Sequence, residues 1–296
     1  MSKKREPLIY IDGEYYPKSQ AKISVYDHGF LYGDGVFEGI RAYNGVVFKL
    51  REHIARLYAS AHVLMLKIPL TQEQMVQAVV DTCRKNKLKD AYIRLVVTRG
   101  IGDLGLDPRK CGEATVIVIA DTIVLHEDEA KVKGITALVS WVRRDPVDGT
   151  SHEVKSLNYL NSVMAKIEAN MSGADEAICL NKEGCLAEGV GENVFVVKNG
   201  KIVTPPTAAG ALEGITAKAV FALAKKLGYD ISEANVTPAM LFNADELFFT
   251  GTAAEIVPIR EVNWRKIGEG TAGPVARRLM TEFKKVVLDP KEGVPF

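Results

Sequence analysis

Apolar and polar residues alternate in short runs over the first fifty positions, which predicts β-strands joined by tight turns. The run LIYIDGEYYP turns at Asp12-Gly13, and the run VFEGIRAYNGVVFKL turns at Asn44-Gly45. Asp-Gly and Asn-Gly between apolar runs are strong hairpin signals, so we predict two antiparallel strand pairs. The stretch between them, residues 27–39, is rich in glycine and aromatic residues, which indicates a sharp bend or a close approach to a ligand.

Apolar residues recur at helical spacing from 51 to 65 and again from 70 to 87, which predicts two helices over one face of the strands. Further strands are expected at 91–100 and 114–120. The segment after them is charged and is expected to carry the domain connection. We therefore predict a smaller N-terminal domain at 1–122, a linker at 123–134 and a larger C-terminal domain at 135–296.

The C-terminal part opens with a strand, followed by a long amphipathic helix that we expect to begin at Lys155. After it the pattern predicts turns at 182–184 and 199–200, a helix at 215–227, strands at 246–250 and 255–259, and a final helix at 273–287. Neither part alternates strand and helix regularly. This pattern predicts an α+β fold and argues against a Rossmann sheet or a TIM barrel.

Composition narrows the class of protein. The chain has 296 residues, against a prior of about 150 residues per domain, which supports two domains. Its 38 basic and 37 acidic residues give a formal net charge of +1, which argues against nucleic acid or an anionic membrane as the partner. We expect small-molecule substrates. No apolar run approaches the ~20 residues that span a bilayer, and no signal-peptide pattern follows the basic N-terminus.

The four cysteines form no CxxC pair and no zinc spacing with the five histidines, so we predict no metal site. A reducing cytoplasm is the simplest compartment for such a chain. Cys179 and Cys185 flank a turn, and whether they pair stays open at this stage.

One constellation fits the needs of pyridoxal phosphate, which are an amine, a carboxylate at the pyridine nitrogen, donors for the phosphate and a partner for the phenolate. Lys155 offers the amine, although a lysine beginning a helix is usually a solvated charge. Glu188 offers the carboxylate, although an acidic residue at the end of a strand is also typical of an ordinary surface position. Tyr159 follows Lys155 by one helical turn, so its hydroxyl is expected on the same side; it also reads as a core tyrosine.

The phosphate has three candidate sites. Two are the glycine-framed turns Gly214-Ile215-Thr216, where a helix begins, and Gly251-Thr252-Ala253, which follows a strand. Either turn also reads as an ordinary cap. The third is Arg56 on the first helix, where an exposed arginine is commoner.

The order of these motifs along the chain is specific. From the N-terminus to the C-terminus, the motifs are DHGFLYGDGVFEGIRAYNG, YIR, KSLNYLNSVMAKIEA, AEGVGENVFVV, TPP, LEGITA, DELFFTGTAAEIVPI and IGEGTAGPV. Nearly the whole chain thereby resembles the class IV, fold-type IV pyridoxal-phosphate aminotransferases, and most closely the branched-chain amino acid aminotransferases. The resemblance implies two α/β domains joined by a short linker, an active site at the domain interface, and a C-terminal domain that carries the lysine.

By this resemblance Lys155 is the Schiff-base lysine, Tyr159 meets the phenolate oxygen and Glu188 pairs with the pyridine nitrogen. The other cofactor contacts that it implies are Arg56, Ile215, Thr216 and Thr252 at the phosphate, and Glu192 and Asn193 close to the cofactor, with Glu192 supporting Arg56. The substrate contacts that it implies are Phe37 and Tyr92 in an apolar pocket, Tyr32 and Leu106 from a neighbouring subunit, Gly39 leaving room beside the cofactor, the Thr252-Ala253 backbone at the α-carboxylate, and Arg94 at the distal carboxylate of glutamate.

The implied reaction moves the amino group of leucine, isoleucine or valine to 2-oxoglutarate by ping-pong kinetics in a homo-oligomer that is at least a dimer. A D-amino acid aminotransferase is the nearest alternative, because Arg99 stands where such enzymes bind a carboxylate. However, Ile101 replaces the expected histidine. An aminodeoxychorismate lyase leaves the Tyr-Ile-Arg motif unexplained. A silent cofactor-binding protein of the same fold is the remaining alternative, although the intact candidate residues count against it.

Overall fold

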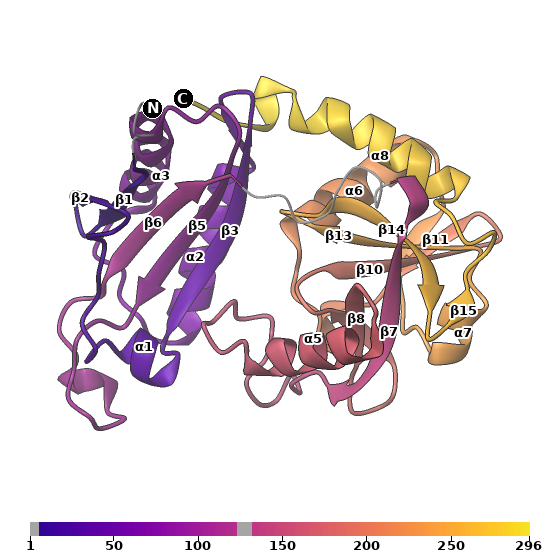
Figure 1. Cartoon of the computed structure of the whole chain (residues 1–296), viewed down its shortest axis with the longest axis horizontal. Coiled ribbons are helices and arrows are strands. Elements are labelled where there is room, and N and C mark those ends of the chain that lie inside the picture. The colour runs from indigo at the N-terminus through magenta and orange to yellow at the C-terminus, as the bar shows by residue number, and fades with distance from the viewer. Residues whose placement is uncertain (1–5, 123–131) are drawn as a thin grey trace. The chain divides into compact units, whose positions relative to one another are not determined.

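The computed structural model describes residues 6–122 and 132–296, which divide into two compact units (Figure 1). The described part of the first unit comprises 6–122, 154–158 and 287–296, and that of the second comprises 132–153 and 159–286. Lys155 therefore belongs to the first unit, whereas the sequence prediction assigned it to the C-terminal domain. Most of the predicted linker lies outside the described residues, and the predicted domain limits remain a proposal.

A seven-stranded sheet forms the first unit, in the order β16-β4-β3-β5-β6-β1-β2. The predicted turns at Asp12-Gly13 and Asn44-Gly45 are confirmed, because all four residues have positive φ, between 46° and 96°. The strands of this sheet are β1 (Leu8–Ile11), β2 (Glu14–Pro17), β3 (Gly35–Tyr43), β4 (Val46–Phe48), β5 (Ala91–Thr98), β6 (Val116–Asp121) and β16 (Gly293–Pro295).

The two predicted helices of the first unit are confirmed as α2 (Leu50–Val63) and α3 (Gln72–Asn86). They contact β3 and β6 and bury one apolar core with the sheet. A capping box between Thr71 and Gln74 begins α3. A short helix, α1 (His28–Tyr32), lies in the glycine-rich stretch where no helix was predicted, and the Asp27 side chain caps it. The turn η1 (Pro108–Lys110) precedes β6.

A nine-stranded sheet forms the second unit, in the order β12-β11-β10-β13-β14-β7-β8-β9, with β15 beside β14. Parallel pairs join β11 to β12 and β7 to both β8 and β14, among otherwise antiparallel pairs. Its strands are β7 (Ile135–Arg143), β8 (Glu176–Leu180), β9 (Leu186–Gly189), β10 (Asn193–Lys198), β11 (Lys201–Thr204), β12 (Ile231–Glu233), β13 (Glu246–Gly251), β14 (Glu255–Val262) and β15 (Arg265–Lys266).

Helices pack against this second sheet, with α5 against β7 and β8 and α6 against β13 (Figure 1). The prediction that a helix begins at Lys155 is wrong, because α5 runs from Leu160 to Ser172 with Tyr159 as its N-cap residue. Glu246 accepts the first N–H groups of the last helix, at 3.0 Å from Val275 and 2.9 Å from Ala276. The other helical segments are α6 (Ile215–Lys226), α7 (Pro238–Phe242), α8 (Pro274–Val287), η2 (Thr207–Ala209) and, in the first unit, η3 (Pro290–Glu292).

Cys179 and Cys185 are free thiols. The register of β8 and β9 pairs Cys179 with Glu188 and Leu180 with Leu186, so the two cysteines do not face each other. Over residues 6–122 and 132–296, no helix is both long and apolar enough to cross a membrane. The same residues contain no group of three His, Cys, Asp or Glu side chains placed to hold a metal ion.

Candidate active site

The segment that carries Lys155 lies along an edge of β3. Phe37 donates its backbone N–H to the Lys155 carbonyl at 3.0 Å, and Leu157 donates to the Gly35 carbonyl at 3.0 Å. The Lys155 N–H in turn donates to the buried Ser60 hydroxyl on α2 at 3.1 Å. These bonds join the segment to the first unit in place of the predicted helical turn, so the argument that one turn of helix aligns Lys155 with Tyr159 is also wrong.

The amine of Lys155 lies over an aromatic ring. Its Nζ is 4.4 Å from the centroid of the Phe37 ring, within the range of a cation–π contact. Phe37 thus contacts both the backbone and the side-chain end of Lys155. An amine held at both ends is suited to covalent chemistry, because little conformational freedom remains to be lost when it reacts.

Arg56 takes part in a buried ion pair that the sequence did not predict. Its Nε and Nη2 donate to the two carboxylate oxygens of Glu38 at 2.7 and 2.8 Å, and His53 Nδ1 lies 2.7 Å from Glu38 Oε2. Burial raises the pKa of Glu38, but the charges of Arg56 and His53 outweigh it and lower that pKa to about 2. Glu38 therefore holds the Arg56 guanidinium in a fixed orientation; support of Arg56 by Glu192 stays a prediction.

The predicted substrate residues of the first unit gather on one face of β3 and β5. Gly39 is paired with Arg94, and Phe37 and Tyr92 lie two positions away on their own strands. The Arg94 guanidinium lies 4.6 Å from the Phe37 ring centroid and donates to the Tyr92 hydroxyl at 3.1 Å. A Cβ at Gly39 would collide with that hydroxyl. The absence of a side chain at Gly39 therefore makes room for Tyr92.

Tyr32 and Leu106 lie on adjoining segments of the first unit. The Tyr32 hydroxyl donates to the Leu104 carbonyl at 2.5 Å, and Leu106, two residues on, is 78% exposed. Their place in a neighbouring subunit's pocket stays a prediction.

Arg99, the residue that favoured a D-amino acid enzyme, is held by groups of its own unit. Its guanidinium donates to both carboxylate oxygens of Asp34, at 2.9 and 3.0 Å, and to the Leu64 and Met65 carbonyls that end α2. This bidentate pair and the two carbonyl bonds occupy the donors that a substrate carboxylate would need.

Glu188 lies in β9 of the second unit and is 4% exposed, so the surface-acid interpretation is wrong. Its Oε2 accepts the Leu212 N–H at 2.9 Å, and its Oε1 lies 3.4 Å from Nε of Arg144 and 3.5 Å from Nδ1 of His152. Arg144 and His152 were not sequence candidates. An arginine directly after an apolar strand is the only local signal for the first of them.

Asn193 and Gly214 position the start of α6. The Asn193 amide donates to the Leu212 carbonyl at 2.8 Å, and a Cβ at Gly214 would collide with the Asn193 side-chain oxygen. Leu212 is thus held at its N–H by Glu188 and at its carbonyl by Asn193. Gly214 is the N-cap residue and supplies no side-chain cap to the buried Ile215 and Thr216. A helix N-terminus of this kind is suited to a phosphate.

Glu192, in the turn before β10, packs against the second glycine turn. It is 7% exposed, and a Cβ at Gly251 would lie 2.9 Å from its Cγ. Thr252 and Ala253 follow in the turn between β13 and β14, half-buried. Burial raises the pKa of the nearby Glu176 to about 7, and the Glu192 charge adds to this.

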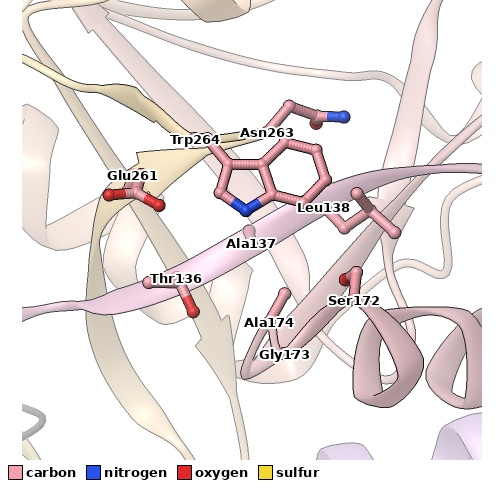
Figure 2. Close-up of a pocket in the computed structure, with 9 residues that line it drawn as sticks. All are labelled: Thr136, Ala137, Leu138, Ser172, Gly173, Ala174, Glu261, Asn263 and Trp264. Atoms are coloured by element: carbon pink, nitrogen blue, oxygen red, sulfur yellow. The ribbon is translucent and has the colours of Figure 1, made fainter.

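A small pocket lies in the second unit (Figure 2). Its volume of about 40 Å³ admits no more than a few water molecules. None of the predicted site residues lines it. Its lining residues are Thr136, Ala137, Leu138, Ser172, Gly173, Ala174, Glu261, Asn263 and Trp264.

Comparison with known proteins shows the family to which the chain belongs. The profile of the family described as amino-transferase class IV matches residues 35–262, so the chain belongs to the class IV aminotransferases. A relative in Methanocaldococcus jannaschii, described as a branched-chain-amino-acid aminotransferase, is 54% identical over 280 residues, which cover 94% of this chain and 96% of that protein.

Solved structures narrow the comparison to branched-chain amino acid aminotransferases. The Escherichia coli enzyme of that name matches with a TM-score of 0.92 at 38% identity, over 95% of this chain and 94% of that one. The T.th. enzyme of that name, complexed with N-(5'-phosphopyridoxyl)-L-glutamate, matches with a TM-score of 0.90 at 41% identity, over 95% and 94%. The predicted family and fold are confirmed.

Proposed function

We infer that the chain is a pyridoxal-phosphate-dependent branched-chain amino acid aminotransferase. It transfers the amino group of L-leucine, L-isoleucine or L-valine to 2-oxoglutarate, giving L-glutamate and the branched 2-oxo acid. The observation that carries this inference is the likeness to the Escherichia coli enzyme over 95% of the chain. The structure of the T.th. relative with a phosphopyridoxyl derivative of L-glutamate supports both the cofactor and the second substrate.

The residues present fit the cofactor. Pyridoxal phosphate needs an amine, an anion at its pyridine nitrogen and donors for its phosphate. Lys155 offers the amine, Glu188 offers a buried carboxylate, and the uncapped start of α6 offers N–H groups. Arg56, oriented by Glu38, and the Thr252 turn would add to the phosphate donors. When bound, the cofactor supplies a ring that draws electron density from the Cα of the amino acid.

We assign the proton transfer to Lys155. Its Nζ would hold the cofactor covalently and, once substrate releases it, would take the proton from Cα as a general base. The hydrogen bonds from Phe37 and to Ser60 hold the Lys155 backbone, so the released amine would stay close to the place where it was bound. Tyr159 would meet the phenolate oxygen.

We assign the choice of substrate to the side chains on the shared face of β3 and β5. Phe37 and Tyr92 would offer apolar surface to a branched side chain, while Arg94, stacked on Phe37, would pair with the distal carboxylate of glutamate. The guanidinium lies against a ring and is half-buried, so it can serve a carboxylate without placing an isolated charge in an apolar pocket.

We further propose a homo-oligomer, at least a dimer. Phe30, Leu104 and Leu106 are 67, 68 and 78% exposed on segments that the Tyr32 hydroxyl joins. Large exposed apolar side chains on adjoining segments are typical of an interaction surface. A second copy covering them would also bring Tyr32 and Leu106 to a neighbouring pocket. Four free cysteines support the cytoplasm as the compartment.

A half-reaction screen tests the proposed function. The purified protein with pyridoxal phosphate is mixed in turn with L-leucine, L-glutamate and D-alanine, and the visible absorption of the cofactor is followed. The inference predicts loss of the band with both L-amino acids and no change with D-alanine. A response to D-alanine alone would assign the chain to the D-amino acid enzymes, and no band at all would contradict the cofactor.

A further inference from the structure

Arg144 follows β7 and is the largest side chain among the fully buried residues, with 2% of its surface exposed. Its Nη1 donates to the Ser162 hydroxyl at 3.0 Å and to the Asn161 side-chain oxygen at 3.1 Å, and its Nη2 donates to the Gly189 carbonyl. These bonds orient the guanidinium so that Nε lies 3.4 Å from Oε1 of Glu188. The cation is therefore fixed beside the carboxylate.

His152 contacts the same carboxylate oxygen, Oε1 of Glu188. Its Nδ1 is 3.5 Å from Oε1 of Glu188, and its Nε2 is 3.1 Å from Oδ2 of Asp145. The ring centroid is 5.8 Å from that of Tyr159. His152 is thus close to both Glu188 and Tyr159, the two residues assigned to the pyridine nitrogen and the phenolate oxygen of the cofactor.

Because Glu188 is buried, the charges around its carboxylate decide whether it is stable as an anion. A carboxylate removed from water is stable as an anion only when charges and hydrogen bonds replace the lost solvation. Glu188 accepts the Leu212 N–H on Oε2, and on Oε1 it has two ion-pair contacts, with Nε of Arg144 at 3.4 Å and Nδ1 of His152 at 3.5 Å, of which the first is not a hydrogen bond. Without the guanidinium, the carboxyl would be driven to bind a proton itself. A protonated carboxyl still has an acceptor oxygen, but it has lost the negative charge that favours a protonated pyridine nitrogen.

We propose that Arg144, with His152 beside it, is a positioning residue that keeps Glu188 a fixed carboxylate for the pyridine nitrogen. The inference rests on the proposed role of Glu188. It assigns Arg144 a task in the reaction that is separate from binding the phosphate or the substrate. The Glu188 anion in turn keeps the ring nitrogen protonated, which is the state in which the ring withdraws electrons.

The test compares Arg144→Gln with Arg144→Lys and with Arg143→Gln, a control at the neighbouring arginine, which donates to the backbone carbonyls of Ser140 and Trp141. The main readout is the ¹⁵N chemical shift of the ring nitrogen in bound, labelled pyridoxal phosphate. We expect a protonated nitrogen in the wild type and Arg143→Gln, a shift towards the unprotonated form in Arg144→Gln, and partial recovery in Arg144→Lys. Turnover should fall on the order of 10- to 100-fold, as is usual when a group that orients a ligand is lost.

An unchanged ¹⁵N shift in Arg144→Gln would overturn the inference. If that variant does not fold, the double variant Arg144→Gln/Glu188→Gln decides, because it removes both charges together. Recovery of folding supports the pairing, and continued failure shows that Arg144 acts only in packing. A wild-type protein that binds no cofactor would instead contradict the proposed function, so the two failures are distinct.

Discussion

The Nζ of Lys155 lies 4.4 Å from the centroid of the Phe37 ring, and the backbone N–H of Phe37 donates to the Lys155 carbonyl at 3.0 Å. One residue of β3 therefore holds both the main chain and the amine of Lys155. The Ser60 hydroxyl completes this support by accepting the Lys155 N–H. The position of the amine is consequently a property of the first unit's sheet and of α2.

Ser60→Ala should lower the free energy of unfolding by about 1 to 3 kcal/mol, because it leaves the Lys155 N–H without its acceptor. Urea unfolding measures this loss. Ser172→Ala is the matched control, since its hydroxyl donates to the Ala169 carbonyl of its own helix, near the end of α5. Equal losses of unfolding free energy in the two variants would show that the hydrogen bond to Lys155 stabilises the protein no more than the bond of Ser172 does.

Acid should destabilise the first unit through Glu38. Its folded pKa of about 2 lies below the ordinary 4.5, so its contribution is complete above about pH 4.5 and is lost as the pH falls towards 2. Burial lowers the pKa of His53, which adds a loss in the same direction below about pH 6.5, because the unfolded state then binds the proton.

Glu38→Gln should therefore reduce stability at pH 7 by about 3 kcal/mol and flatten its dependence on pH between 4.5 and 2. Chemical unfolding at a series of pH values checks this. Glu73→Gln, which removes an exposed partner of Arg51, should change little. A Glu38→Gln protein with the wild-type pH profile would contradict the assigned ion pair.

Gly39→Ala should disturb the substrate face, because the new Cβ collides with the Tyr92 hydroxyl. We expect a rise in KM for leucine of about tenfold, the consequence of displacing a pocket wall by a fraction of an ångström. Tyr92→Phe removes the colliding atom, so Gly39→Ala/Tyr92→Phe should recover most of the loss relative to Tyr92→Phe alone. Absence of recovery would place the effect of Gly39 elsewhere.

Arg94→Ala should slow the half-reaction with glutamate by about tenfold or more and the half-reaction with leucine much less, since only glutamate offers a distal carboxylate. Rapid mixing of each amino acid with the loaded enzyme gives both rates. Arg41→Ala, which removes a cation stacked on Tyr43, serves as the control. Equal losses in the two half-reactions would refute the role of Arg94.

Local features of this fold were predictable because nearby residues determine them. The Asn44-Gly45 turn and the capping box of α3 each depend on a few adjacent positions. The helix expected to begin at Lys155 begins instead at Leu160, because the backbone of the preceding segment bonds to β3 and Ser60, which are distant in sequence. Apolar spacing cannot reveal such partners.

The candidate site residues also divide into those that the local sequence predicts and those that it does not. Lys155 and Glu188 were proposed from their motifs, whereas Arg144, the ion-pair partner of Glu188, was not, because the two residues are far apart in the sequence and meet only in the folded unit. Glu38 carried a usable signal. An acid within the apolar strand VFEGI must find a cation when buried, and the first long helix supplies Arg56.

The central claim is that Lys155 carries the cofactor. Borohydride reduction of the protein loaded with pyridoxal phosphate, followed by peptide mapping, tests it most directly, with Lys166→Ala and Lys155→Ala run alongside. We predict a single phosphopyridoxyl adduct on the peptide that contains residue 155, retained in Lys166→Ala and lost in Lys155→Ala. An adduct on any other lysine of the wild-type protein would contradict the account.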